Sequence, residues 1–291
     1  MRDKIDVLRK LANKTSSSGL SRIFDSNVTK AINGVRIVDV GQGDCIGILD
    51  QQDEVCAYVD FGGYLDHPDK KHPAQNKVRM PVHAGARRVP IIVTHWDQDH
   101  IYSAHAYNTD AQKCDWLVPR QWVSPFAARL AAKVKGARCW PESKGQGVHS
   151  IQLGSQTVEI RKCEAFDPKR PKEDRNLTGL AITVLDDRRG RLRQMVLPGD
   201  CPFHLIPNVQ PVPIRHLVAY HHGAKTHWTA KTTLFLTQMA RFRSLSYSYS
   251  PKNNYGHPER SSYDPDWNLL AFGTPFARSN GEMHVDVKWG P

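Results

Sequence analysis

The stretch that decides the fold is Val89-Pro90-Ile91-Ile92-Val93-Thr94-His95-Trp96-Asp97-Gln98-Asp99-His100. Its apolar first half is typical of a short buried strand. After Thr94 the run changes to a His-x-Asp-x-Asp-His pattern, which places four candidate ligands within six residues. Divalent metals such as zinc bind neutral imidazole and ionised carboxylate, so this density predicts a metal centre at a strand end. The alternative is a solvated acidic turn, but few other roles place so many ligands directly behind an apolar strand.

Length and charge narrow the class of protein. The 291 residues suffice for one large domain or two small ones, with a sizeable core. The formal net charge of +11 favours a polyanionic partner, with nucleic acid ahead of an acidic membrane surface. No stretch approaches the roughly 20 apolar residues that cross a bilayer, and the charged N-terminus lacks the apolar core of a secretory signal. We therefore expect a cytoplasmic protein without a membrane partner.

The cysteines do not suggest a metal or redox motif. Six are scattered along the chain without a Cys-x-x-Cys pair, which argues against a zinc ribbon or a thioredoxin-like centre. In a cytoplasmic setting we expect all of them to be reduced.

The hydrophobic spacing predicts an α/β chain with a helical extension over 1–33 and one domain over 34–291. No linker or internal repeat divides that domain. The expected strands cover 35–40, 45–49, 55–60, 89–93, 117–118, 151–159, 181–185, 216–220 and 245–250, and the expected helices cover 125–134 and 232–240. A charged insertion is expected over 161–175.

Ligand-type residues follow three of the apolar runs, and we expect these runs to meet at one edge of a sheet. A dinuclear site needs about two or three protein ligands for each ion and a bridging carboxylate, with a position left for water. His95 and Asp97 would hold one ion, and Asp99 and His100 the other. Asp200 would bridge the two ions. One histidine of the pair His221–His222 would complete the second site, and the sequence leaves open which one.

Six motifs, which together cover about residues 34 to 260, resemble those of the metallo-β-lactamase-fold hydrolases, and are most similar to the ComEC-type competence domains within that superfamily. They are Asp39-Val40-Gly41-Gln42-Gly43-Asp44, Asp60-Phe61-Gly62, Thr94 to His100, Leu197-Pro198-Gly199-Asp200, His221 to Thr226, and Asn254-Tyr255-Gly256-His257-Pro258. Asp97 stands where most of the superfamily has histidine, as in the ComEC-type variant.

This resemblance implies an αββα sandwich of two mixed sheets flanked by helices, with a dinuclear centre that hydrolyses phosphodiester bonds. Zinc is the expected metal and manganese the alternative. The superfamily usually supplies a further histidine to the first ion from the middle of the chain, and this sequence has no matching residue. Asp167 and Asn176 lie in that region without fitting the pattern. The first ion is therefore predicted to be one protein ligand short.

Other residues are expected to support the ions or to bind the substrate. Asp44 and Asp60 would orient metal ligands, or would be turn carboxylates. Asp99 would orient the attacking hydroxide, and His257 would act as general acid or donate to a phosphate, or would be a loop residue. The remaining expected substrate contacts are Lys225, Asn254 and Tyr255.

Three functions fit these features. The first is a metal-dependent phosphodiesterase or nuclease acting on DNA or RNA, and the second is a hydrolase of a small phosphodiester such as a cyclic nucleotide or a lipid headgroup. The third is a metal-binding sensor that holds a partner with little or no catalysis. ComEC-type domains are commonly fused to a membrane channel, which this chain lacks, so we expect it to act with protein partners in a multi-component assembly. A fold alone does not rank these functions.

Overall fold

The computed structural model describes residues 31–63, 82–84, 87–141, 146–164, 174–209, 211–238, 244–249, 255–256, 258–259 and 284–289. The first thirty residues, which hold most of the predicted helical extension, lie outside this set, as do Asp167, Asn254 and His257. The first strand begins at Ile32, so the last two residues assigned to the extension belong to the sheet.

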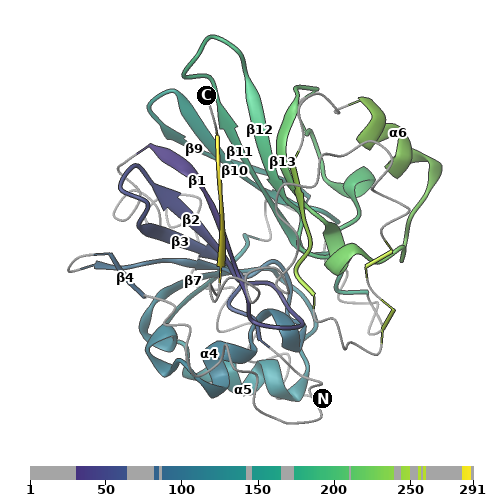
Figure 1. The fold of residues 1–291 in the computed structure, drawn as a ribbon. Coiled ribbons are helices and arrows are strands. Elements are labelled where there is room, and N and C mark those ends of the chain that lie inside the picture. The colour runs from purple at the N-terminus through teal and green to yellow at the C-terminus, as the bar shows by residue number, and fades with distance from the viewer. Residues whose placement is uncertain are drawn as a thin grey trace.

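Two mixed β-sheets form the body of the protein (Figure 1). The first has seven strands in the order β15-β1-β2-β3-β6-β7-β8, and the second has six in the order β14-β13-β12-β11-β10-β9. The strands of the first sheet are β1 (Ile32–Val38), β2 (Ile46–Asp50), β3 (Val55–Val59), β6 (Ile91–Ile92), β7 (Asp115–Val118), β8 (Gly136–Cys139) and β15 (His284–Lys288). Those of the second are β9 (Gly147–Leu153), β10 (Gln156–Lys162), β11 (Leu180–Asp186), β12 (Arg193–Leu197), β13 (Ile214–Val218) and β14 (Ser244–Ser246). A separate two-stranded ribbon pairs β4 (His83–Ala84) with β5 (Arg87–Arg88).

Helices and helical turns complete the layers. The α-helices are α4 (Tyr102–Ala106), α5 (Pro125–Lys133) and α6 (Ala230–Gln238), and the 3-10 turns are η1 (Gln98–His100), η2 (Thr109–Lys113), η4 (Phe203–Leu205) and η5 (Tyr220–Gly223). In Figure 1, α4 and α5 lie beside β7, and α6 lies beside β13. The predicted α/β sandwich of two mixed sheets flanked by helices is confirmed.

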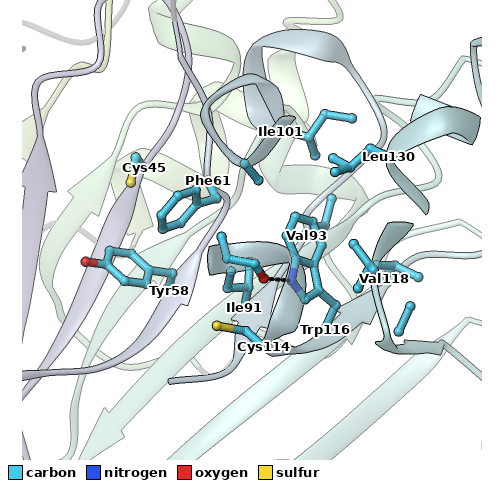
Figure 2. Packing of buried hydrophobic residues seen from close by; sticks show 14 of the residues in the cluster. Cys45, Tyr58, Phe61, Ile91, Val93, Ile101, Cys114, Trp116, Val118 and Leu130 are labelled. Carbon is cyan, nitrogen blue, oxygen red and sulfur yellow. Dashed lines mark hydrogen bonds between the residues drawn. The ribbon is translucent and has the colours of Figure 1, made fainter. Parts of the chain in front are cut away.

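Alternation along the strands divides the core into three layers. Because successive side chains of a strand point to opposite faces, Ile91 and Ile92 enter different clusters. Ile92 packs between the sheets with residues such as Ile182 of the second sheet. Ile91 lies in the cluster that α4 and α5 cover, with Trp116 and Leu130 (Figure 2). A third cluster covers the outer face of the second sheet and includes residues of η4, η5 and β14.

The sequence prediction differs from the structure at the strand expected over 151–159. This segment is a hairpin, in which β9 and β10 are antiparallel and pair through Leu153 and Gln156. Gly154 lies between them at φ +63°, a left-handed conformation that glycine adopts without steric cost. The expected charged insertion also begins too early, because Arg161 and Lys162 are buried residues of β10.

The cysteines depart in part from the expected reduced state. Cys163 and Cys201 are joined by a disulfide, with Cα atoms 6.9 Å apart. Cys163 follows β10 and Cys201 follows β12, so only the tertiary structure reveals this pairing. The other four cysteines are buried and take no part in a disulfide.

A buried histidine is expected to make stability depend on pH. His216 of β13 lies between two serine hydroxyls of β14, with Nδ1 2.7 Å from Ser244 Oγ and Nε2 3.2 Å from Ser246 Oγ. Burial lowers the pKa of His216 to about 3. Since the unfolded chain takes up this proton below its ordinary pKa while the folded chain does not, the free energy of unfolding should fall as pH drops from 6.5 toward 3.

Urea denaturation at pH 6.5 and pH 5.0 measures this effect. From the 1.36 kcal/mol associated with each pKa unit, His216 should account for about 2 kcal/mol of the stability lost over this interval. The variant His216→Gln should lose that dependence, while the same substitution at the exposed His227 should retain it. An unchanged dependence in His216→Gln would contradict the prediction.

Candidate metal centre

The ligand-type residues follow the carboxyl ends of parallel strands, which lie at one edge of the sandwich. In the first sheet β3, β6 and β7 run parallel, and in the second β12, β13 and β14 do. Thr94 to His100 follow β6, Asp200 follows β12, and His221–His222 follow β13. Carboxyl ends of parallel strands are where α/β proteins bind ligands. The structure therefore brings together all seven predicted metal ligands: His95, Asp97, Asp99, His100, Asp200, His221 and His222.

The segment after β6 is fixed by a buried tryptophan. Trp96 is fully buried, and its indole Nε1 donates to the carbonyl of Pro119 at 3.1 Å. Its backbone N–H donates to Gln121 Oε1 at 3.2 Å. With Trp96 directed into the protein, the neighbouring residues His95 and Asp97 face the second sheet, where Asp200 lies 3.4 Å from His95 Nε2. A large apolar residue inside the ligand motif thus orients the ligands on either side.

Both residues of the histidine pair have a left-handed backbone conformation. His221 lies at φ 47°, ψ 48° and His222 at φ 54°, ψ 22°, and the two ring centroids are 6.1 Å apart. Such angles are unfavourable for residues with a Cβ, and strain of this kind clusters at functional sites. The turn directs the two rings to different oxygens of Asp200.

The first donor set lies around Asp200 Oδ2. His95 Nε2 is 3.4 Å from this oxygen and 3.4 Å from Asp97 Oδ2. His221 Nε2 is 3.6 Å from the same Asp200 oxygen. The sequence predicted that the first ion would lack one protein ligand. In the structure, His221 lies beside this first set.

The second donor set lies around Asp200 Oδ1. This oxygen is 3.2 Å from His100 Nε2 and 3.9 Å from His222 Nε2. Asp99 Oδ2 is 3.1 Å from His222 Nε2 and 4.0 Å from His100 Nε2. His222 is therefore the histidine of the pair that faces the second set, and Asp200 stands between the two sets as the bridging role requires.

The chemistry of these atoms fits a bound cation. Within the described part of the chain, His95 Nε2, His100 Nε2 and Asp200 Oδ1 are buried without a hydrogen-bond partner. Burying such groups without a hydrogen bond costs free energy, and a divalent ion with nitrogen and oxygen ligands would satisfy all of them. Two triads with ligand atoms within 4.8 Å of one another, His95–His100–Asp200 and Asp99–His100–His222, cover this region.

Electrostatics in the cluster favour positive charge. Burial lowers the pKa of His95, but the carboxylates of Asp200 and Asp97 outweigh it and raise that pKa to about 9. Burial likewise lowers the pKa of His222. The hydrogen bond to Asp99 and the charge of Asp200 outweigh it and raise that pKa to about 9. Burial raises the pKa of Asp200, but the surrounding histidines hold it well below its ordinary range. Three carboxylates thus create a field in which a metal ion would take the place of protons on the imidazoles.

Asp60 and Asp44 lie directly behind the ligands. Asp60 is fully buried and accepts from His100 Nδ1 at 2.8 Å, from Thr94 N at 2.7 Å and from Thr94 Oγ1 at 2.7 Å. A carboxylate on the remote nitrogen of a ligating histidine fixes its tautomer, so Asp60 makes the contact that its predicted role requires. Asp44 Oδ1 lies 3.7 Å from His222 Nδ1, which is 2.7 Å from the carbonyl oxygen of Ser248.

Two of the predicted substrate residues, Lys225 and Tyr255, are in the described part of the chain, and both are exposed. Lys225 is exposed on the segment after η5, and Tyr255 is 57% exposed. The backbone N–H of Glu259 donates to the carbonyl of Gly223 at 2.9 Å, which holds the end of the sixth motif beside the histidine pair. His257 and Asn254 are outside the described residues.

Sequence reasoning missed two residues at the site. Arg175 Nη2 lies 2.5 Å from Asp97 Oδ1, and the fully buried Gln121 connects the segments around both residues. Neither belongs to a motif, since Arg175 lies in a charged segment and Gln121 between two strands. No signal in a single sequence distinguishes them from ordinary surface or loop residues.

A close approach of backbones makes Gly62 essential to this arrangement. Its N–H donates to the carbonyl of Asp44 at 2.8 Å, and an added Cβ would overlap the carbonyl oxygen of Asp99. We expect Gly62→Ala to displace the Asp99 segment and to lower the free energy of unfolding by about 3 kcal/mol, the upper part of the usual overpacking range. Gly154→Ala, where nothing lies within 4 Å of the added atom, isolates the cost of a left-handed backbone, about 1–2 kcal/mol. Equal losses in urea denaturation would contradict the prediction.

Comparison with known proteins finds no family model and no curated protein that matches this chain. Solved structures do match. CmlA, a diiron β-hydroxylase from Streptomyces venezuelae, is 11% identical with a TM-score of 0.47, and the match covers 89% of this chain and 55% of CmlA. A B3 metallo-β-lactamase with an active-site glutamic acid is 11% identical with a TM-score of 0.31, covering 72% of this chain and 71% of that one. The chain spans about half the length of CmlA.

The described part of the chain has no helix that is both long and apolar enough to cross a membrane.

Proposed function

We propose that this protein is a metal-dependent hydrolase with a dinuclear centre that cleaves phosphodiester bonds in nucleic acid. One observation supports it most directly: the two carboxylate oxygens of Asp200 face different donor sets, one near His95 and His221 and the other near His100 and His222. A carboxylate between two clusters of imidazoles is the arrangement expected of a two-metal site. The resemblance of the sequence motifs to metallo-β-lactamase-fold hydrolases points to the same chemistry.

The proposed site assigns different roles to buried and accessible residues. Two divalent cations held there would activate water near neutral pH and neutralise charge that develops on the phosphoryl group. His95, His100, His222 and Asp200 are at most 4% exposed, so they are suited to holding the ions. Asp99 is 20% exposed, with one oxygen toward His222, and would orient the attacking water from the open side.

Charge supports a polyanionic substrate. The chain carries a net charge of +11, and Arg175 and Lys225 are accessible near the centre. If phosphate contacts provide the affinity, binding of DNA should weaken steeply with salt, by about 10³-fold or more between 50 and 200 mM for six or more contacts.

Labelled single- and double-stranded DNA and RNA, incubated with the protein in Mn²⁺ or Zn²⁺, test this function. The double variant Asp99→Ala, His100→Ala should lose cleavage, whereas Asp187→Ala, which removes an exposed carboxylate, should retain it. Equal cleavage by the wild type and the double variant would overturn the proposal.

The same preparation separates the other two functions. Salt-insensitive turnover of bis(p-nitrophenyl) phosphate without cleavage of DNA or RNA would assign a small phosphodiester as substrate. Fewer than about one bound ion per folded chain, where the two-metal mechanism needs two, would instead assign a binding component.

A further inference from the structure

The segment from Asp174 to Thr178 lies against the first donor set. Arg175 Nη2 is 2.5 Å from Asp97 Oδ1, and Asn176 Nδ2 is 3.5 Å from His221 Nδ1. Two adjacent residues of one segment thus contact Asp97 of the first set and His221 beside it. This is the region in which the sequence offered no matching histidine.

Buried hydrogen bonds fix the backbone of Arg175 relative to the ligands. Its carbonyl accepts from Gln121 Nε2 at 2.5 Å, and the same nitrogen is 2.8 Å from Thr178 Oγ1. The other end of the Gln121 amide accepts from Trp96 N, the residue before Asp97. Because Gln121 is fully buried, the position of Arg175 is coupled to that of the metal-ligand segment rather than to solvent.

The guanidinium and the donor set use different oxygens of Asp97. Asp97 Oδ2 faces His95 Nε2 at 3.4 Å, while Arg175 is on Oδ1. Arg175 therefore does not compete for the oxygen that faces the ion site. It constrains the carboxylate so that Oδ2 points inward, which is how an outer partner orients a ligand.

The same guanidinium is accessible from solvent. The Arg175 and Asp97 side chains are 33% and 28% exposed, whereas His95 is 1% exposed. Arg175 is thus on the side from which a substrate would approach. A guanidinium has five N–H donors in a planar fork, so one nitrogen can hold a carboxylate while others bind a phosphate oxygen.

We propose that Arg175 is both a positioning residue for Asp97 and a binding residue for the phosphate group of the substrate. This inference rests on the proposed function for its second part. The first part, the orientation of Asp97, depends only on the contacts within the chain.

Three variants test both parts: Arg175→Gln removes the charge, Arg175→Lys keeps it without the fork, and Arg129→Gln is a control that removes an exposed arginine from α5. For each variant, Mn²⁺ titration calorimetry measures the affinity of the two ions, and calorimetry of the Mn²⁺-loaded protein measures binding of inorganic phosphate. We expect Arg175→Gln to weaken one of the two ions by about 10–100-fold, the usual effect of losing an outer partner. Phosphate binding should weaken by at least about 10-fold, as loss of a charge-assisted bond predicts. Arg175→Lys should recover only part of each, and Arg129→Gln should match the wild type.

These readouts do not depend on turnover, so they distinguish failure of this inference from failure of the proposed function. If the wild type binds Mn²⁺ and phosphate but cleaves no phosphodiester, the proposed reaction is wrong. The variants would still report on both roles of Arg175, the positioning of Asp97 and the binding of phosphate. Unchanged ion and phosphate affinities in folded Arg175→Gln would overturn the inference. Weakened ion binding with unchanged phosphate binding would overturn its second part. With bis(p-nitrophenyl) phosphate as substrate, the inference also predicts a rise in KM larger than the fall in kcat.

Discussion

Asp200→Ala is expected to abolish hydrolysis and to prevent the binding of a second ion. Its two oxygens lie between four imidazoles, with contacts from 3.2 Å to 3.9 Å, so no other described carboxylate can take its place between the sets. Activity should fall by more than the roughly 10–100-fold typical of losing an outer partner, because a shared ligand is removed. The metal content, measured by atomic emission after gel filtration, should drop from about two ions per chain to at most one.

Two controls accompany this measurement. Asp200→Asn keeps the shape of the side chain but removes its charge, so similar losses in both variants would assign the effect to charge. Asp187→Ala removes an exposed carboxylate from the turn after β11 and should leave metal content unchanged. Two ions still bound to Asp200→Ala would contradict the bridging role.

Asp60→Asn should produce the second largest effect, through the tautomer of His100. A carboxylate oxygen of Asp60 accepts from His100 Nδ1 at 2.8 Å, which leaves Nε2, 3.2 Å from Asp200 Oδ1, available as a metal ligand. An amide nitrogen in that place would donate to Nδ1 and shift the proton to Nε2. Metal affinity should then fall by about 10–100-fold, and the free energy of unfolding by about 1–3 kcal/mol, since the buried hydroxyl of Thr94 loses its acceptor.

The backbone at this position makes the substitution a clean test. Asp60 has a φ of 59°, a left-handed conformation that asparagine tolerates about as well as aspartate. Asp53, with a φ of 60°, is a half-buried position at which the same substitution controls for the backbone. Metal titration and urea denaturation of Asp60→Asn and Asp53→Asn should therefore differ strongly. Matching curves would show that Asp60 does not set the state of His100.

Much of the candidate metal centre could be assembled from the sequence because its residues follow apolar runs in the chain. The ligand motif after Val93 and the lone Asp200 after Leu197 each follow a buried strand, and ends of neighbouring parallel strands meet at one edge of a sheet. The strands themselves follow from short apolar runs, which are a local property of the sequence. The one strand pair that was merged, β9 and β10, is divided by a two-residue turn at Gly154–Ser155 that leaves little trace in the apolar pattern.

Contacts between distant segments were not predictable. Arg175 and Gln121 belong to no motif, and their relation to Asp97 and Trp96 exists only once β7 and the segment before β11 pack beside the metal-ligand loop. The pairing of Cys163 with Cys201 likewise depends on β10 and β12 ending near each other.

The sequence by itself determined which side chains could hold metal, because ligand type and proximity to a strand end are properties of the chain. Only the tertiary structure decided how those ligands are divided. His221 and His222 are neighbours in sequence, yet their left-handed backbone directs one ring to each oxygen of Asp200. The direction of a side chain depends on its φ and ψ angles, and here those angles are imposed by packing around η5, where His221 N donates to the carbonyl of Gly199. The motif after β6 therefore predicted a metal centre, and the fold supplied the histidine that its first set lacked in the sequence.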